Sequence, residues 1–518
     1  MSASRWFRDP LILLYIVAAL GAVVAQSGEL GSSDTTHRLQ TTHSFWTSEP
    51  PVFPDEYPEF GVHGRGGKIY GWYGIGQSLL MLPADVVGTY IQRLSWFSHY
   101  DDTDPSPRDI VVVYSTEVLI NVLTALICFR FLSLLSFTVR QSVAGVLALL
   151  FATTHLHYSQ NMMENNYIML LTLAGLTLQY QWLLTGRKRA LIVGSAALGL
   201  NLLTRLTTGL DIIATGLFIL FLIYCDHVGE KLPRITAYCK ATIPIYTCFF
   251  VIDRIYQFYR FGSFLNTYVS MTAKEMRALN PSLPANYPWE TPFHVGFLGP
   301  LITPEKSIFL FDPLLLLTIL VALVCWRYFT PAIKLYVVMS SLLFLAYICL
   351  YARYTVWSGD FAWGDRYVST AAEMAAFISV PLLLKYRKQA GTAVFRTGAA
   401  LIVVSTLIQI ASLAFWLPLE IYQMETLGHP TFVVLLRLKN IAAFALGKMD
   451  AWGLNNHAMT EDPWDYVHIT TWNFLPFLLR RAGVAPAWVV ETVLVGWTTS
   501  VLAFLGAGWR LLAVLGAP

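Results

Sequence analysis

Charged residues are scarce in this chain. Asp, Glu, Lys and Arg make up only 13% of its 518 residues, hydrophobic residues make up 55%, and the mean hydropathy is +0.54. This balance excludes a soluble globular protein and is typical of a polytopic membrane protein. The net charge is only +3, and the sequence has no run of basic residues with aromatic residues between them. We therefore expect no nucleic-acid partner. The expected partners are membrane lipids and lipid-linked molecules.

Cysteine is also sparse, with six residues in the whole chain. All six lie within or beside apolar segments: Cys128, Cys225, Cys239, Cys248, Cys325 and Cys349. This placement argues against a disulfide framework or a cysteine metal cluster.

Long apolar segments are abundant. Crossing about 30 Å of hydrocarbon takes roughly 17 to 25 residues. Twelve segments approach that length, near residues 10–26, 109–134, 142–157, 166–185, 189–206, 208–225, 240–257, 308–326, 331–350, 367–385, 397–416 and 487–513. The sequence therefore predicts an all-α polytopic membrane protein with about 12 transmembrane helices.

The charge distribution gives an orientation. With the N-terminus in the cytoplasm, basic residues predominate in the connections on that side, as in Arg187-Lys188-Arg189, and acidic residues predominate on the other. We therefore expect both termini in the cytoplasm and the irregular loops outside. A signal peptide cleaved after Ala25 is the alternative, although the apolar run is longer than the usual signal core.

The outer loops divide the chain into two predicted regions. Residues 1–416 form a transmembrane catalytic region, with interfacial helices in the first outer loop, 27–108. Within that loop, residues 76–90 predict an interfacial or re-entrant helix, because Pro83 and Asp85 interrupt the apolar run. Residues 417–518 form an outer loop with an amphipathic segment at 430–446, an aromatic stretch at 464–477 and the last transmembrane helix.

A polar stretch, Gly31 to Trp46, follows the first apolar segment, and its lone carboxylate is Asp34. We expect Asp34 to lie just outside the membrane surface, and it is a candidate catalytic base. The alternative is a structural role, because Ser33 and Asp34 are favoured N-cap residues and the following residues repeat at helical spacing.

Several arginines map to the same outer level. A helix rises about 1.5 Å per residue. Arg205 therefore lies near the opposite end of its apolar segment from Arg189, and Arg353 lies near the opposite end of its segment from Lys334. Arginine binds phosphate through two parallel hydrogen bonds, so we predict phosphate binding by four basic residues. They are Arg205, Arg353, Arg366 and Lys68. The alternative for any one of them is an interfacial side chain that reaches water.

A divalent cation is the one candidate cofactor. Glu164, His155 and His157 lie in the outer turn between the third and fourth segments and could bind a metal ion together with Asp34. The alternative is an ordinary polar turn.

The loops then show a resemblance. The chain resembles the GT-C class of integral membrane glycosyltransferases, in the branch of protein mannosyltransferases and bacterial lipid A aminoarabinose transferases. The similarity rests on the acidic residue in the first outer loop, Phe261-Gly262-Ser263, the stretch Leu301 to Pro313, and a Trp-x-Gly-x-x-x-Trp-Gly-x-Arg-Tyr pattern. That pattern comprises Trp357, Gly359, Trp363, Gly364, Arg366 and Tyr367. The class often has Asp-Glu where this chain has Asp34-Thr35, which removes the second carboxylate of a metal site.

The resemblance implies an inverting transfer of a sugar from a polyprenyl-phosphate donor to a hydroxyl of a lipid, glycan or protein acceptor. Asp34 would be the base, and Glu164, Trp363 and Tyr367 would organise the site. The alternative is a transporter or flippase of lipid-linked sugars. Transporters tend to have internal repeats and ionisable residues at the bilayer midplane. Here no repeat is evident and the polar residues gather at one rim, so the transferase is favoured.

Overall fold

The structure is a computed structural model that describes residues 9–100, 103–225, 231–360, 362–416, 418–425, 428–448, 471–483 and 485–516. In this part of the chain, seven helical segments are long and apolar enough to cross a membrane. They are α5 (Pro107–Leu134), α8 (Glu164–Thr185), η4 with α10 (Leu206–Thr208 and Gly209–Cys225), α11 (Lys231–Phe261), α16 (Pro331–Tyr351), α19 (Arg387–Ser412) and α24 (Ala487–Gly516). The predicted all-α polytopic membrane fold is confirmed.

The predicted number of 12 spans is not confirmed, because several apolar segments are short or broken. Two consecutive helices, α6 (Val139–Ala152) and α7 (His155–Asn161), would make an eighth span if they are taken together. The bend between them is 51°. The other segments form α2 (Pro10–Ala25), α9 (Lys188–Thr204), α14 (Ile308–Phe311), α15 (Leu314–Cys325) with η5 (Trp326–Tyr328), α17 (Ser369–Ala376) and α18 (Ser379–Lys385). The break between α14 and α15 falls at Asp312, where the following proline disfavours helical backbone.

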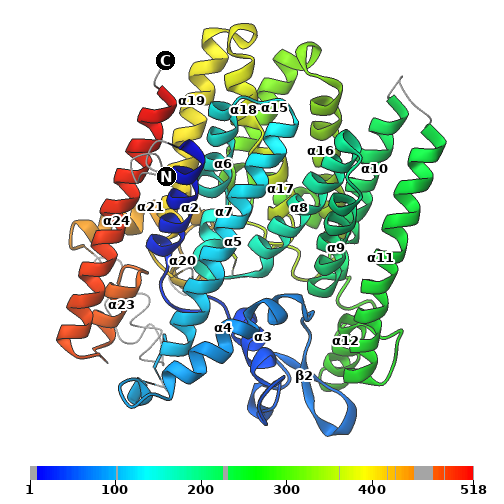
Figure 1. Cartoon of the computed structure of the whole chain (residues 1–518). Coiled ribbons are helices and arrows are strands. Elements are labelled where there is room, and N and C mark those ends of the chain that lie inside the picture. The colour runs from blue at the N-terminus through cyan, green and yellow to red at the C-terminus, as the bar shows by residue number, and fades with distance from the viewer. Residues whose placement is uncertain are drawn as a thin grey trace.

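The loops that follow α2 and α11 fold into a small layer beneath the helix bundle, at the bottom of Figure 1. Its helices and strands are α3 (Ser33–His43), η1 (Pro54–Glu56), β1 (Gly61–His63), η2 (Arg65–Gly67), β2 (Ile69–Gly71), α4 (Gly76–Gln92), η3 (Ser98–Tyr100), α12 (Tyr268–Leu279) and α13 (Phe293–Ile302). The two strands pair antiparallel, with Val62 opposite Tyr70. Of the predicted loop helices, the one at 76–90 is α4, which continues through Pro83.

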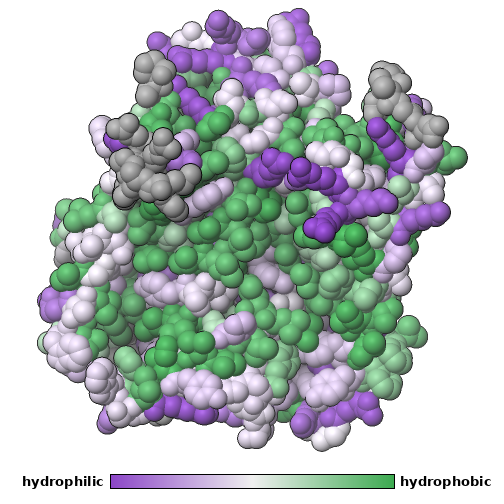
Figure 2. Space-filling view, in the orientation of Figure 1, coloured by the Kyte–Doolittle hydropathy of each residue, from purple (hydrophilic) through white to green (hydrophobic). Residues whose placement is uncertain are grey.

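The side of the molecule in Figure 2 carries a broad apolar belt between polar upper and lower margins. Exposed apolar side chains of the outermost helices belong to such a surface; Leu502 and Trp509 on α24 are 65% and 77% exposed. Inside the bundle, Phe131, Tyr336 and Phe377 pack ring against ring. Apolar residues thus face both the core and the surroundings, as expected for helices in lipid.

The C-terminal region returns to the start of the chain. Trp497 on α24 donates a hydrogen bond to the carbonyl of Val24, 3.1 Å away, and α24 packs along α2 (Figure 1). Between α19 and α24 lie α20 (Pro418–Glu425), α21 (Val433–Ala445) and α23 (Leu475–Ala482). The amphipathic segment at 430–446 corresponds to α21, whereas residues 464–470 of the aromatic stretch lie outside the described residues. The division into 1–416 and 417–518 stays a prediction.

Candidate active site

Helix α3 places Asp34 at the centre of a charged cluster. The N-cap of α3 is Ser32, whose side chain accepts the backbone N–H of Thr35, so Asp34 lies in the first turn and is not the cap. The approach to α3 passes Gly31, where φ is +74° and an added Cβ would lie 2.5 Å from the Cα of Asn161. Only glycine tolerates both conditions, which fixes where the helix begins.

Both oxygens of Asp34 have partners. The Tyr73 hydroxyl donates to Oδ1 over 2.7 Å, and the Arg366 guanidinium donates to Oδ2 over 2.5 Å. Burial alone would raise the pKa of Asp34, but the positive charges of Arg366 and Arg38 outweigh it and hold that pKa below its ordinary value. Burial and the adjacent Asp34 carboxylate raise the pKa of Tyr73 well above its ordinary value, so this phenol stays protonated and donates. Asp34 is therefore ionised at neutral pH.

Glu164, at the start of α8, forms the second half of the cluster. Its Oε2 lies 2.7 Å from a guanidinium nitrogen of Arg38, and its Oε1 pairs with Arg205. Arg38 also lies over the Tyr73 ring, 4.5 Å from its centroid. Asp34 and Glu164 are thus joined through Arg38 and Tyr73.

The loop that carries Arg366 is held from two sides. The buried Lys306 ammonium donates to the backbone carbonyls of Asp360 and Ala362, at 2.6 and 2.9 Å. Asn165 donates to the carbonyl of Arg366 over 2.7 Å. Gly359 has φ +76°, and an added Cβ there would meet Arg366 at 2.8 Å. These contacts fix the backbone from which Arg366 reaches Asp34.

Aromatic rings line the same region. Tyr367 stacks on Tyr351 with ring centroids 4.4 Å apart. The guanidinium groups of Arg205 and Arg366 lie 5.2 and 5.3 Å from the centroid of the Tyr367 ring. Such contacts orient arginine side chains without using their hydrogen-bond donors.

The charges of the cluster do not cancel. The guanidinium groups of Arg38, Arg205 and Arg366 surround only the two carboxylates of Asp34 and Glu164. The Asp34 and Arg366 side chains remain 18% and 13% exposed, so the cluster is not sealed. A partly open site with an excess of guanidinium groups favours an anionic ligand, and a phosphate matches guanidinium geometry.

The other predicted site residues lie apart from these contacts. Arg353 and Lys68 have exposed side chains. Trp363 is fully buried, edge-on to Phe311 and stacked on His157.

The residues predicted to bind a cation are not assembled for it. His155 is fully buried, with Nδ1 4.0 Å from a carboxylate oxygen of Glu373, while Glu164 is engaged by two arginines. Across the described residues, no three His, Cys, Asp or Glu side chains come together so that they could hold a metal ion. The donor set therefore does not fit a divalent cation.

Sequence reasoning missed Arg38 and Tyr73. Arg38 follows Asp34 by four residues, the spacing that places two side chains on one face of a helix, and that signal was available. Tyr73 had no such signal. It reaches Asp34 because the buried Arg260 guanidinium donates to the carbonyls of Gly71 and Tyr73, at 2.5 and 3.0 Å.

Comparison with known proteins gives a fold relationship. No protein-family model and no curated protein sequence matches the chain. Its structure is similar to that of the Archaeoglobus fulgidus oligosaccharyltransferase tethered with an acceptor peptide, with a TM-score of 0.50 and 12% identity. The match covers 82% of this chain and 58% of the archaeal one, so the chain spans little more than half of that relative. A structure of ArnT from Cupriavidus metallidurans, bound to undecaprenyl phosphate, matches over 99% of this chain and 77% of its own, with a TM-score of 0.43 and 13% identity. The chain therefore shares the fold of the matched part of the archaeal oligosaccharyltransferase.

Proposed function

We propose that this protein is an inverting glycosyltransferase. It would move a sugar from a polyprenyl-phosphate donor to an acceptor hydroxyl on a lipid, glycan or protein, at the periplasmic face of a bacterial inner membrane. The observation that supports this most directly is the partly open cluster in which three guanidinium groups surround two carboxylates. A fold shared with an archaeal oligosaccharyltransferase is consistent with it but does not by itself assign an activity.

The cluster supplies the two functions that the reaction needs. The acceptor oxygen attacks the anomeric carbon, the bond from that carbon to the phosphate oxygen breaks, and the phosphate leaves with the electron pair. Asp34 takes the acceptor proton as general base. Because the leaving group is already an anion, no general acid is required, in contrast to glycoside hydrolysis.

Arg366 and Arg205 would stabilise the negative charge that grows on the departing phosphate. They are oriented before the reaction, by Asp34 and Glu164 and by the ring of Tyr367. Preorganised donors at a site with little water contribute several kcal/mol, because they do not have to reorganise as charge develops.

The test is sugar transfer from a radiolabelled polyprenyl-phosphate-sugar pool in membranes, comparing the parent with Asp34→Asn at matched expression. The expected loss is about 10²- to 10⁴-fold, the usual contribution of a general base, with donor binding retained. Asp55→Asn is the matched control, because Asp55 is an exposed carboxylate in the same outer loop.

Two results would contradict the proposal. Full transfer by the Asp34→Asn variant would leave Asp34 with a structural role only. If the parent itself transfers no sugar while it moves the lipid-linked sugar across the membrane, the protein is a flippase.

A further inference from the structure

At the other end of α16, away from the Asp34 cluster, residues of α15, η5 and α16 line a cavity of about 320 Å³. The turn between these helices lies at the top of Figure 1, whereas α3 and β2 lie at the bottom. Helix α16 separates the two sites: Val337 near its start lines the cavity, and Tyr351 at its end stacks on Tyr367 beside the Asp34 cluster. This cavity is therefore not part of the proposed active site.

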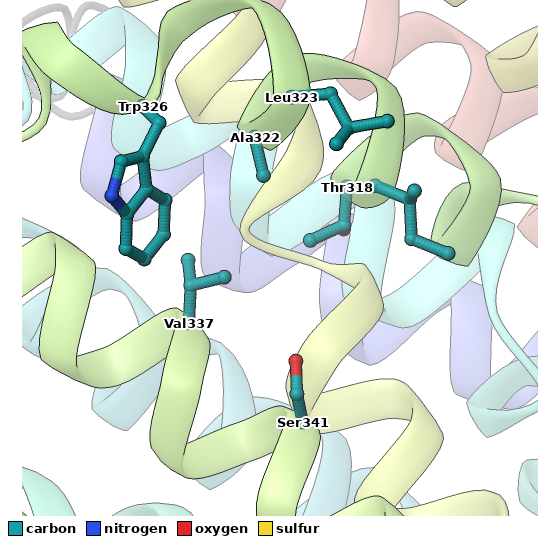
Figure 3. Close-up of a pocket in the computed structure, with 7 residues that line it drawn as sticks. Thr318, Ala322, Leu323, Trp326, Val337 and Ser341 are labelled. Atoms are coloured by element: carbon teal, nitrogen blue, oxygen red, sulfur yellow. The ribbon is translucent and has the colours of Figure 1, made fainter.

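The cavity lies where the two helices diverge toward different neighbours. Both pack against α17, but α15 packs mainly against α18 and α19, whereas α16 packs mainly against α10. The Thr318 hydroxyl on α15 donates a hydrogen bond to the backbone carbonyl of Ala375 in α17, over 2.8 Å. The space between α15 and α16 is left unfilled, and in Figure 3 the indole of Trp326 faces Val337 across it.

The lining is that of a site for hydrocarbon. Its residues are Thr318, Ile319, Ala322, Leu323, Trp326, Val337 and Ser341. The only hydroxyls are those of Thr318 and Ser341, and Thr318 already donates to a backbone carbonyl. Leu323 is 79% exposed and Ile319 is 47% exposed, so the mouth opens sideways, on apolar helices that face lipid. An acyl chain fits such an opening, because a dry apolar space does not retain water.

Positive charge lies where the headgroup of that lipid would be. The Lys334 ammonium is 5.9 Å from the centre of the Trp326 ring, and the exposed Arg327 follows Trp326 directly. No acidic residue occurs between Leu314 and Tyr351. A zwitterionic headgroup gains little from these two cations, whereas an anionic one is attracted by both.

We propose that the α15–α16 cavity binds one anionic phospholipid, with an acyl chain between Ala322 and Val337 and the headgroup phosphate on Arg327 and Lys334. The chemistry is that of a phosphodiester beside a hydrocarbon chain. The proposal is independent of the proposed transferase activity.

The test is native mass spectrometry of the purified full-length protein, titrated with phosphatidylglycerol or with phosphatidylcholine of the same acyl chains. The parent should retain phosphatidylglycerol and release phosphatidylcholine. Replacing Arg327 and Lys334 by glutamine should weaken phosphatidylglycerol retention about fivefold for each charge removed. The matched control replaces Lys388 and Arg396, two exposed basic residues of α19, by glutamine and should retain the lipid as the parent does.

A second variant tests the cavity itself. Ala322→Trp should fill the space and abolish retention, whereas Leu316→Trp, on a lipid-exposed position of α15 outside the cavity, should leave it intact. Equal retention of both phospholipids, or unchanged retention after loss of both cations, would overturn the proposal. So would displacement of phosphatidylglycerol by an equimolar polyprenyl phosphate, since the site would then belong to a prenyl chain.

Discussion

The network around Arg437 and the network around Asp34 are both built from arginine and carboxylate, but they differ in how their charges are matched. Arg437 and Glu420 are fully buried and form two parallel hydrogen bonds of 2.6 Å each. The remaining guanidinium nitrogen of Arg437 donates to the carbonyl of Ser412, also over 2.6 Å. One cation meets one anion, both come from consecutive helices, and no charge is left over.

The network around Asp34 is assembled from distant parts of the chain and retains unmatched charge. Asp34 comes from α3, Glu164 from α8, Arg205 from the end of α9, and Arg366 from the loop before α17. Three guanidinium groups face two carboxylates, and the side chains of Asp34 and Arg366 keep some exposure. The network around Arg437 is a closed network, in which matched charges hold helices together. The network around Asp34 is an open network, in which excess charge is suited to a ligand.

The largest effect that separates the two networks is expected on stability. Glu420→Gln leaves Arg437 buried without an opposite charge, which costs about 3–5 kcal/mol of unfolding free energy. Thermal unfolding in detergent measures the loss. Glu425→Gln, an exposed position on the same helix, is the control and should melt as the parent does. Unchanged melting of the Glu420 variant would mean that the closed network contributes no more than an exposed ion pair.

A change of similar size is expected in catalysis when the open network loses an arginine. Arg366→Gln should lower the transfer rate about 10²- to 10³-fold, the usual cost of one preorganised donor at a charged transition state. Its melting temperature should fall less than that of the Glu420 variant, because its site is partly open. Sugar transfer under single-turnover conditions measures the rate, with Arg93→Gln on an exposed surface as control. If the Arg366 variant lost as much thermal stability as the Glu420 variant, the open network would have the same structural role as the closed network.

A smaller effect is expected for Arg38, which orients its neighbours. Arg38→Lys keeps the charge but loses the planar fork that pairs with Glu164 and lies over Tyr73. We expect about a tenfold loss of kcat/KM, carried mainly by KM. The split between kcat and KM is the measurement. A variant that matches the parent in both would show that charge alone suffices at this position.

The sequence predicted the part of the open network that carries strong chemical signals. Asp34 was visible as the lone carboxylate of a polar stretch after an apolar segment, and Glu164, Arg205 and Arg366 as ionisable residues at one rim. The structure brings these four together. Tyr73 was not visible, because its position depends on a two-stranded sheet and on a hydrogen bond from Arg260, far along the chain.

The fold was predictable at the level of class and less so in detail. Apolar run length predicts helices in lipid well, because backbone groups there must be paired within the segment. It does not reveal where a run breaks. The bend between α6 and α7 and the break at Asp312 depend on buried polar contacts, such as those of Asp312 with Thr154. Breaks of this kind, together with the short helices α2 and α9, account for the unconfirmed count of spans.

A pH dependence is also expected at Asp365, which adjoins Arg366 in the loop. Burial raises the pKa of Asp365 from 3.8 to about 7. A carboxyl group whose pKa is higher in the folded state destabilises the fold as pH rises from its unfolded pKa to its folded one. Asp365→Asn should therefore melt like the parent near pH 4 and roughly several degrees higher at pH 8.

The measurement is the difference in melting temperature between variant and parent across that range. It also sharpens the comparison of the two networks, because a neutral Asp365 leaves the excess positive charge around Asp34 in place. Above pH 7 an ionised Asp365 would offset part of that charge, and phosphate binding should weaken in the parent but not in the Asn variant. A melting difference that does not change with pH would show that Asp365 is ionised throughout, and that the open network is more closely matched than its contacts indicate.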